Sequence, residues 1–292
     1  MELHRILTSS FASRTAVIAT YVFFVSTMLS IGLTVRADEI RGALRNRGLL
    51  ARVLVANVIL VPILGMVLVK LFPLSADART AILLLAFVPG GTQAIQFTAK
   101  IGKNIALAAA LLFLLSLAGI VVSPLLAALI LPVETGVTIP WQHAVGFIVL
   151  FLLLPLLAGF ALGRGATQVA GALQKPMLLI SNISFVLTIV FTLGLRRKAA
   201  GSIGWAALTA MALLILLSMA IGWRLGGPDK SARQVSAIAT SMRNAGLCLL
   251  VAAASFPGRN VQTATVAFMA LMVPPNMLFT ACQRLRGGRG QT

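Results

Sequence analysis

Acidic residues are scarce in this chain of 292 residues, which contains six Asp and Glu against 24 Lys and Arg. Charged residues make up only 10% of the sequence, whereas about a quarter is usual in soluble domains. Hydrophobic residues reach 59%, and the mean hydropathy is +1.00. This composition excludes a water-soluble globular domain and predicts a surface that faces lipid.

The positions of the few acidic residues and cysteines also give no indication of a catalytic site. All six acids fall at the ends of apolar segments or in the loops between them: Glu2, Asp38, Glu39, Asp77, Glu134 and Asp229. The two cysteines, Cys248 and Cys282, fit neither a disulfide framework nor a metal site. Because no HExxH motif, acidic metal cluster or Ser-His-Asp set is visible, we expect no enzyme, no cofactor and no metal.

Long apolar runs dominate what is present, and runs such as 104–132 do not alternate as barrel strands would. The sequence therefore predicts an all-α, polytopic membrane protein with about nine transmembrane helices. We expect these segments at 15–35, 50–72, 80–99, 104–132, 140–163, 174–195, 202–223, 232–255 and 260–282, after a tail at 1–14 and before a cytoplasmic tail at 283–292.

The formal net charge of +18 is interpreted as an orientation signal in short loops, not as a nucleic-acid surface. Fifteen Lys and Arg fall at one set of segment ends and eight at the other, and Arg243 is the remaining one. This asymmetry predicts a C-terminus in the cytoplasm and an N-terminus outside, in a bacterial inner membrane. The cluster Arg196–Lys198 opposes that orientation. No cleavable signal peptide is evident at the start.

Two of the apolar segments are interrupted near their centres. Segment 80–99 contains Pro89, Gly90 and Gly91, which remove a backbone donor and add flexibility in mid-membrane. Segment 232–255 contains Arg243 and Asn244 among small polar residues. Broken helices that cross at the membrane midplane are typical of transporters built from inverted repeats, and we expect an inverted repeat here.

The same residues resemble a known family. The fourth and fifth helices of the bile acid:sodium symporter family resemble FVPGGTQAIQFTAKIGKNIALAAALLFLLSLAGIVVSPLLAALILP, and its ninth resembles SMRNAGLCLLVAAASF. Its second helix and following loop resemble FVSTMLSIGLTVRADEIRGALRN. The resemblance implies a panel domain at 15–35 and 140–195 and a core domain at 50–132 and 202–282. It also implies transport of an organic anion that binds between them.

The residues that hold two sodium ions in that family have largely lost their oxygen atoms here. Carried over from the resemblance, the ligand positions are Asn57, Ala94, Ile95, Ala108, Leu112, Ala239 and Arg243. Among them Asn57 is a polar counterpart, whereas Ala, Ile and Leu cannot coordinate a cation. A fixed guanidinium in the same place would repel sodium. Sodium coupling of the usual kind is therefore doubtful for this chain.

Arg243 has two functional interpretations and one in which it has no functional role. It could brace the carbonyl ends of the broken helices with its five donors, or bind a substrate carboxylate or sulfonate. Alternatively it snorkels to water, or its register is misjudged. Other candidates for the substrate site are Asn244, Thr92, Gln93 and Gln96, because they flank the two breaks.

The preferred hypothesis is a secondary transporter of a small organic anion, bile-acid-like or a carboxylate, in which Arg243 replaces the sodium ligands. The alternatives are an ordinary sodium:organic anion symporter with a remapped site, or a membrane sensor or scaffold that no longer transports. An arsenite-efflux relative is disfavoured, since Val88 precedes Pro89 where those proteins have cysteine. The expected partners are the anion and the lipid bilayer, without nucleic acid; the substrate's identity and the oligomeric state stay open.

Overall fold

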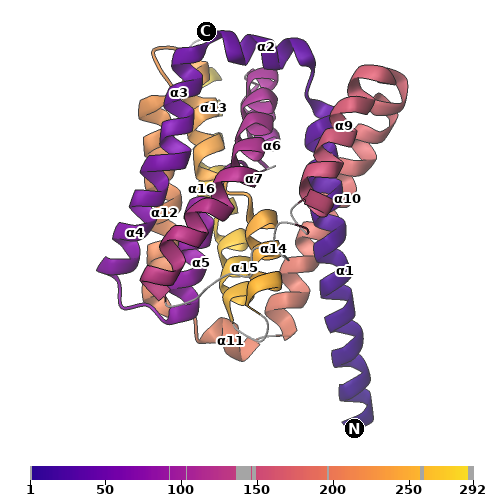
Figure 1. The fold of residues 1–292 in the computed structure, drawn as a ribbon, viewed down its shortest axis with the longest axis vertical. Helices are drawn as coiled ribbons and strands as arrows, with labels where there is room; N and C mark the ends of the chain where they lie inside the picture. The colour runs from indigo at the N-terminus through magenta and orange to yellow at the C-terminus, as the bar shows by residue number, and fades with distance from the viewer. Residues whose placement is uncertain are drawn as a thin grey trace.

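The computed structural model describes residues 2–91, 93–102, 104–135, 146, 149–195, 197–256 and 260–288. Within these residues the chain is helical and contains no strand, which confirms the predicted all-α membrane fold (Figure 1). The helices are α1 (Glu2–Thr34), α2 (Ala37–Arg45), α3 (Arg47–Val55), η1 (Ala56–Leu60), α4 (Val61–Leu71), α5 (Ala76–Phe87), α6 (Gln93–Lys100), α7 (Ile105–Thr135), η2 (Val149–Leu153), α9 (Leu154–Gly165), α10 (Thr167–Leu195), α11 (Arg197–Gly201), α12 (Gly204–Leu225), α13 (Lys230–Ser241), α14 (Ala245–Ser255), α15 (Val261–Leu271) and α16 (Val273–Gly288).

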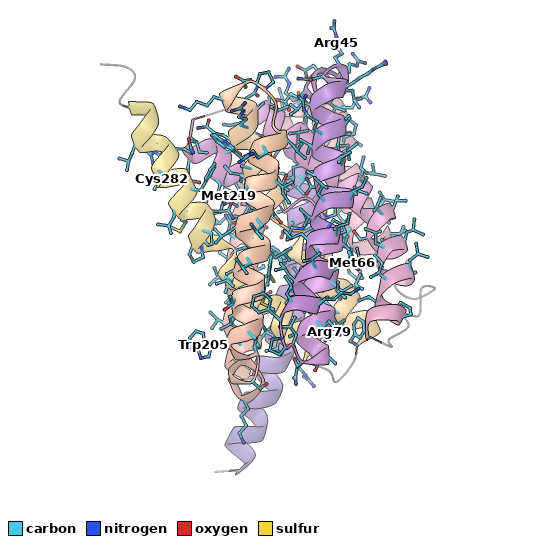
Figure 2. The ribbon with its side chains drawn as sticks, turned by 90° about the vertical axis from the view of Figure 1, so that its left-hand side faces the viewer. Arg45, Met66, Arg79, Trp205, Met219 and Cys282 are labelled. Atoms are coloured by element: carbon cyan, nitrogen blue, oxygen red, sulfur yellow. The ribbon has the colours of Figure 1, made fainter. Side chains whose placement is uncertain are left out.

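Among the described residues, 6 helices are long and apolar enough to cross a membrane. The two interrupted segments and Val149–Gly165 are each too short to count alone, so the total of nine stays a prediction. Arg45 lies at one end of the long axis, and Arg79 and Trp205 lie towards the other (Figure 2). The start of α1 and the end of α16 lie towards opposite ends (Figure 1), as an odd number of crossings requires.

Both predicted tails are partly helical. We expected a tail at 1–14, yet α1 begins at Glu2, and α16 continues past the expected boundary at 283 to Gly288. Hydropathy marks where an apolar segment ends, but backbone hydrogen bonds within a helix continue through polar residues beyond that point. The tail boundaries themselves stay a prediction, and the apolar span of the first segment begins at Arg14.

Two π-helical turns each lead into an α-helix, and a proline follows each of them closely. η1 comes just before Pro62, and η2 just before Pro155. A proline ring lacks an N–H group and clashes with the carbonyl four residues earlier, so the preceding turn widens. In η1 the widened turn contains Asn57, whose side chain is completely buried.

Helices α1, α9 and α10 pack against one another along one side of the molecule, and α4, α5, α7, α12 and α15 form most of the remaining body (Figure 1). Gly32 and Gly159 allow α1 and α9 to approach closely. A Cβ atom on Gly32 would lie 2.2 Å from the carbonyl oxygen of Leu156. Small residues at such contacts are typical of membrane helix pairs. The division of these groups into panel and core domains stays a prediction.

We expect Gly32→Ala to destabilise the protein by about 1–3 kcal/mol, because a methyl group there must push two backbones apart. Thermal unfolding of the purified protein in detergent would measure the loss. Gly42→Ala is the matched control, since a Cβ atom at Gly42 has open space and alanine favours a helix. Equal midpoints for the two variants would contradict the close α1–α9 contact.

Candidate functional site

The two broken helices meet at their unwound segments, which hydrogen-bond to each other. α5 ends at Phe87 and α6 begins at Gln93, while α13 ends at Ser241 and α14 begins at Ala245. The Gly91 N–H donates to the Met242 carbonyl at 2.9 Å, and the Asn244 N–H donates to the Val88 carbonyl at 3.2 Å. This reciprocal pair joins the interruptions, so backbone groups freed by each break satisfy those of the other.

Glycine is required at this crossing for two different reasons. Gly90 has a φ of 83°, a region that other residues adopt rarely. At Gly91 a Cβ atom would lie 2.6 Å from the Arg243 carbonyl oxygen, so no side chain fits between the two segments. Pro89, Gly90 and Gly91 thus form the break that the sequence predicts, and α7 packs against it at Gly119.

The guanidinium of Arg243 lies behind the crossing and bonds to the carbonyl ends of both incoming half-helices. Its Nε donates to the Leu85 carbonyl at 2.9 Å and its Nη2 to the Ala86 carbonyl at 2.6 Å. Its Nη1 donates to Asn57 Oδ1 at 2.9 Å and to the Thr240 carbonyl at 3.4 Å. The side chain is 1% exposed, so this network of four bonds is closed off from water.

Asn57 extends the network into a third helix. Its Nδ2 donates to the Val53 carbonyl at 3.0 Å and to Thr240 Oγ1 at 3.1 Å, while its Oδ1 accepts from Arg243. On the other side, Ser123 Oγ of α7 donates to the Phe87 carbonyl at 2.9 Å. Together these side chains satisfy carbonyls that a helix end leaves without partners.

The charge of Arg243 is balanced by helix dipoles, and no carboxylate among the described residues contacts it. The carboxyl-terminal ends of α5 and α13 converge on the guanidinium, and each carries the equivalent of roughly half a negative charge. Two such ends offset about one positive charge. A bound cation would be balanced in the same way, so Arg243 is an electrostatic equivalent of an ion at this place.

The remaining positions carried over from the family's sodium ligands present hydrocarbon. Ala94, Ala108, Leu112 and Ala239 are each at most 2% exposed, and Ala108 and Ala239 belong to one apolar cluster with Val53, Leu111, Leu115 and Val235. Ile95 is partly buried and lines a cavity. The structure brings Asn57 and Arg243 into contact, but the other positions offer no side-chain oxygen to a cation.

The predicted substrate residues are mostly engaged in structural bonds. The Asn244 side chain accepts from the Leu247 N–H at the start of α14, and Gln96 Nε2 donates to Asn182 Oδ1 of α10 at 2.7 Å. Gln93 is 8% exposed. Thr92 lies outside the described residues. Arg243 spends its donors on the half-helix carbonyls and Asn57, and it does not line the cavities described next, which favours bracing over direct substrate contact.

Two cavities lie along the seam between α1 and α10 and the helices facing them. One, of about 280 Å³, is lined by residues that include Thr20, Tyr21, Thr192 and Gln262. The other, of about 110 Å³, reaches from α1 and α10 to Ile95 of α6 and Ile105 of α7. Between the two levels, the rings of Phe23 and Phe185 lie 5.5 Å apart.

Sequence reasoning missed the hydroxyl groups that line the smaller cavity. Thr27, Ser30 and Thr34 recur on one face of α1, and Thr27 Oγ1 lies 2.6 Å from Ser181 Oγ of α10. Their spacing of three and four residues was a signal for a polar helix face in the first apolar segment. Ser123 does not stand out in the sequence, because single hydroxyls are common in membrane helices, and Thr240 is visible there as one of the small polar residues around Arg243.

The family relationship can now be tested by comparison with known proteins. A model of the Sodium Bile acid symporter family matches residues 21–203, which include the first broken helix and its α7 neighbour. The chain belongs to the sodium bile acid symporter family. The resemblance predicted from the sequence motifs is thereby confirmed, and family membership together with the membrane-spanning helices makes this a multi-pass membrane protein.

Two curated relatives of this chain are plant proteins. One is a probable sodium/metabolite cotransporter, BASS2, chloroplastic, from Oryza sativa subsp. japonica, 24% identical over 89% of this chain. The other is a probable sodium/metabolite cotransporter, BASS1, chloroplastic, from Arabidopsis thaliana, 24% identical over 81%. The matched regions span 60% and 59% of those relatives.

Proposed function

We propose that this protein is a secondary transporter of a small organic anion that works without the sodium sites of its family. In this proposal Arg243 provides a permanent positive charge where other members bind ions. The observation that carries it is the set of bonds from Arg243 to the Leu85 and Ala86 carbonyls and to Asn57. A filled and braced crossing does not need an ion to hold its two halves together.

The preference for an anion is supported by the electrostatics of the crossing. The amino-terminal ends of α6 and α14 begin at Gln93 and Ala245, directly after the breaks, and helix amino termini favour negative charge. Because the charge of Arg243 is offset by the carboxyl-terminal ends of α5 and α13, these amino-terminal ends supply the positive potential at the crossing. An anion in the seam would therefore be attracted, whereas a cationic substrate would be repelled.

The transport cycle that we propose moves α1, α9 and α10 as a panel against the remaining core. The two cavities at different levels of the seam would be the two ends of the substrate path. The Gln96–Asn182 hydrogen bond, which joins α6 of the core to α10 of the panel, would close the path between them. We further propose the bacterial inner membrane as its location, with the C-terminus in the cytoplasm.

An ordinary sodium symporter is the second candidate, because both relatives carry the name sodium/metabolite cotransporter. It requires a sodium site elsewhere than the positions described above. A sensor that binds the anion without moving it is the third. The sodium-independent transporter and the ordinary symporter differ in whether sodium is needed for anion binding. The sensor differs from both because it would not carry the anion across the membrane.

A thermal unfolding screen tests the proposal. The purified protein is heated with taurocholate, pantoate and other organic anions, each in sodium chloride and in choline chloride at equal ionic strength. We expect at least one anion to raise the unfolding midpoint equally in both salts, since a ligand at about 100 times its Kd stabilises by about 2.7 kcal/mol. Stabilisation by sodium alone, or only in its presence, would favour the ordinary symporter.

Uptake into liposomes separates transport from sensing. The anion that stabilises best is supplied in labelled form to protein reconstituted with choline chloride on both sides. We expect saturable uptake that empty liposomes lack. Binding without uptake would support the sensor, and absence of any anion effect on the unfolding midpoint would remove the anion proposal altogether.

A further inference from the structure

A pocket of about 470 Å³ lies apart from the crossing, where the end of α1, the start of α2 and the α9–α10 turn meet. Its position relative to the membrane follows from the neighbouring spans. One span ends at Thr34 and the next begins at Arg47, so the connecting α2 lies at the level of the lipid headgroups. Figure 1 shows α2 lying across this end of the molecule.

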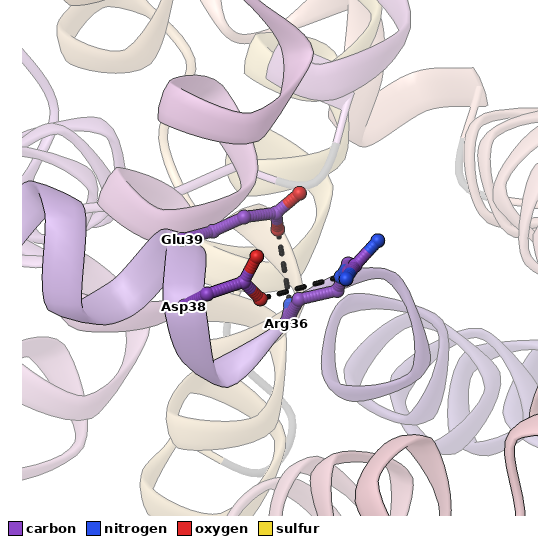
Figure 3. Close-up of polar contacts among 3 residues, drawn as sticks. All are labelled: Arg36, Asp38 and Glu39. Carbon is purple, nitrogen blue, oxygen red and sulfur yellow. Dashed lines mark hydrogen bonds and ion pairs between the residues drawn. The ribbon is translucent and has the colours of Figure 1, made fainter.

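Two guanidinium groups border the pocket, Arg36 from just before α2 and Arg164 from α9, and with the Asp38 carboxylate they leave a net charge of +1 (two positive, one negative). Arg36 bonds through Nε to Asp38 Oδ1 at 3.3 Å, and the far end of its guanidinium extends away from that carboxylate (Figure 3). Glu39 is engaged separately, since its Oε2 accepts from the Arg36 backbone N–H at 3.0 Å. Arg164 lies 5.8 Å from the centroid of the Phe160 ring, which orients it. Both arginines therefore keep donors for an anion.

The other walls of the pocket suit a lipid headgroup. Thr167 begins α10, a helix of 29 residues, and the first amides of such a helix favour a phosphate group. Leu33, Val35 and Ala170 are apolar and lie beside the polar part. A ligand with a phosphate at one end and a hydrocarbon body next to it would meet matching surfaces.

We propose that this pocket binds the phosphate of an anionic phospholipid from the adjoining leaflet. Arg36 and Arg164 would hold the phosphate oxygens by charge-assisted hydrogen bonds, and the apolar wall would receive the start of the acyl chains. The location at headgroup level favours a lipid over a free phosphate ester, which would bind the same donors without using that wall.

Lipid binding would act on the substrate path, because the pocket shares two residues with the smaller cavity of the seam. Thr34 and Gln174 line both, and Gln174 Nε2 donates to Thr34 Oγ1 at 3.3 Å. A phosphate between Arg36 and Arg164 would fix the end of α1 against the start of α10. The bound lipid would therefore hold these panel helices together beside the smaller cavity.

The test measures thermal unfolding in detergent with dioctanoyl phosphatidylglycerol, dioctanoyl phosphatidylcholine or glycerol 3-phosphate. We expect the phosphatidylglycerol to raise the midpoint and the other two to have little effect. In Arg36→Gln/Arg164→Gln its apparent affinity should fall by about thirtyfold, from two lost arginine contacts. Arg41→Gln/Arg45→Gln is the matched control, since it removes the same charge from exposed positions on α2 outside the pocket.

Each outcome decides the inference. Equal losses in both double variants would overturn it in favour of a diffuse attraction between the basic loops and the lipid surface. An unchanged response in Arg36→Gln/Arg164→Gln would also overturn it. If glycerol 3-phosphate stabilised as well as the lipid, a free phosphate ester would replace the lipid as ligand. Should the first double variant fold poorly without lipid, Arg164→Gln alone, at an exposed side chain, gives the same comparison.

Discussion

Replacing Arg243 with alanine should destabilise the protein by about 3–5 kcal/mol and abolish anion-dependent stabilisation. Four hydrogen bonds at the membrane average of about 0.6 kcal/mol each account for roughly half of that loss. The rest arises because the Ala86 carbonyl stays buried after losing its Arg243 donor, which costs about 1–3 kcal/mol, whereas the Leu85 carbonyl keeps the Val88 N–H as a donor at 3.4 Å. Thermal or denaturant unfolding of the purified variant would measure the change.

Two further variants separate the causes. Arg243→Lys keeps the charge, but a single ammonium cannot span the carbonyls and Asn57 as the planar guanidinium does, so we expect an intermediate loss. Arg45→Ala removes an arginine exposed at the end of the molecule (Figure 2) and should leave stability nearly unchanged. An Arg243→Ala protein with the stability and anion response of the wild type would contradict the bracing role.

The membrane fold could be predicted because lipid makes strong demands on a sequence. Each apolar run had to be helical, since no water satisfies the backbone there, and Pro89, Gly90 and Gly91 predicted the first break. The helix ends were less well predicted. α1 extends to Glu2, because no proline or glycine in residues 2–14 stops a helix even though many of these residues are polar.

The site was predictable as far as single residues could reveal it. The depth of Arg243 in an apolar segment already demanded compensation, but its partners lie 157 and 158 residues away in sequence and have no signal of their own, being backbone carbonyls. Asn57 contacts it through a π-helical turn that the following proline creates, and such a turn is not visible as a pattern. The lipid pocket is likewise formed by loops that meet only in the fold.

Restoring the family's sodium ligands should create sodium-dependent stabilisation where the wild type has none. The variant combines Arg243→Gln, Ala239→Glu, Ala94→Ser and Ile95→Asn. It removes the positive charge, adds a carboxylate and two polar side chains, and keeps Asn57 in place. At about 100 times the Kd of the new site, sodium would stabilise the protein by about 2.7 kcal/mol, measured as the midpoint in sodium chloride minus that in choline chloride.

A neutral counterpart shows whether charge, not just polarity, builds the site. The same variant with Ala239→Gln in place of Ala239→Glu has nearly the same shape but no carboxylate. Its stabilisation by sodium should be much weaker. The reason is that two opposite unit charges 4 Å apart attract by about 4 kcal/mol at an effective dielectric constant of 20. Ala239 lies in an apolar cluster with Ala108, where a polar side chain can prevent folding. Each variant must therefore first show a cooperative unfolding transition, as evidence that it is folded. The folded glutamate variant could have the same unfolding midpoint in sodium chloride as in choline chloride. In that case these residues would not surround an ion position, and Arg243 would brace the crossing without replacing a bound ion.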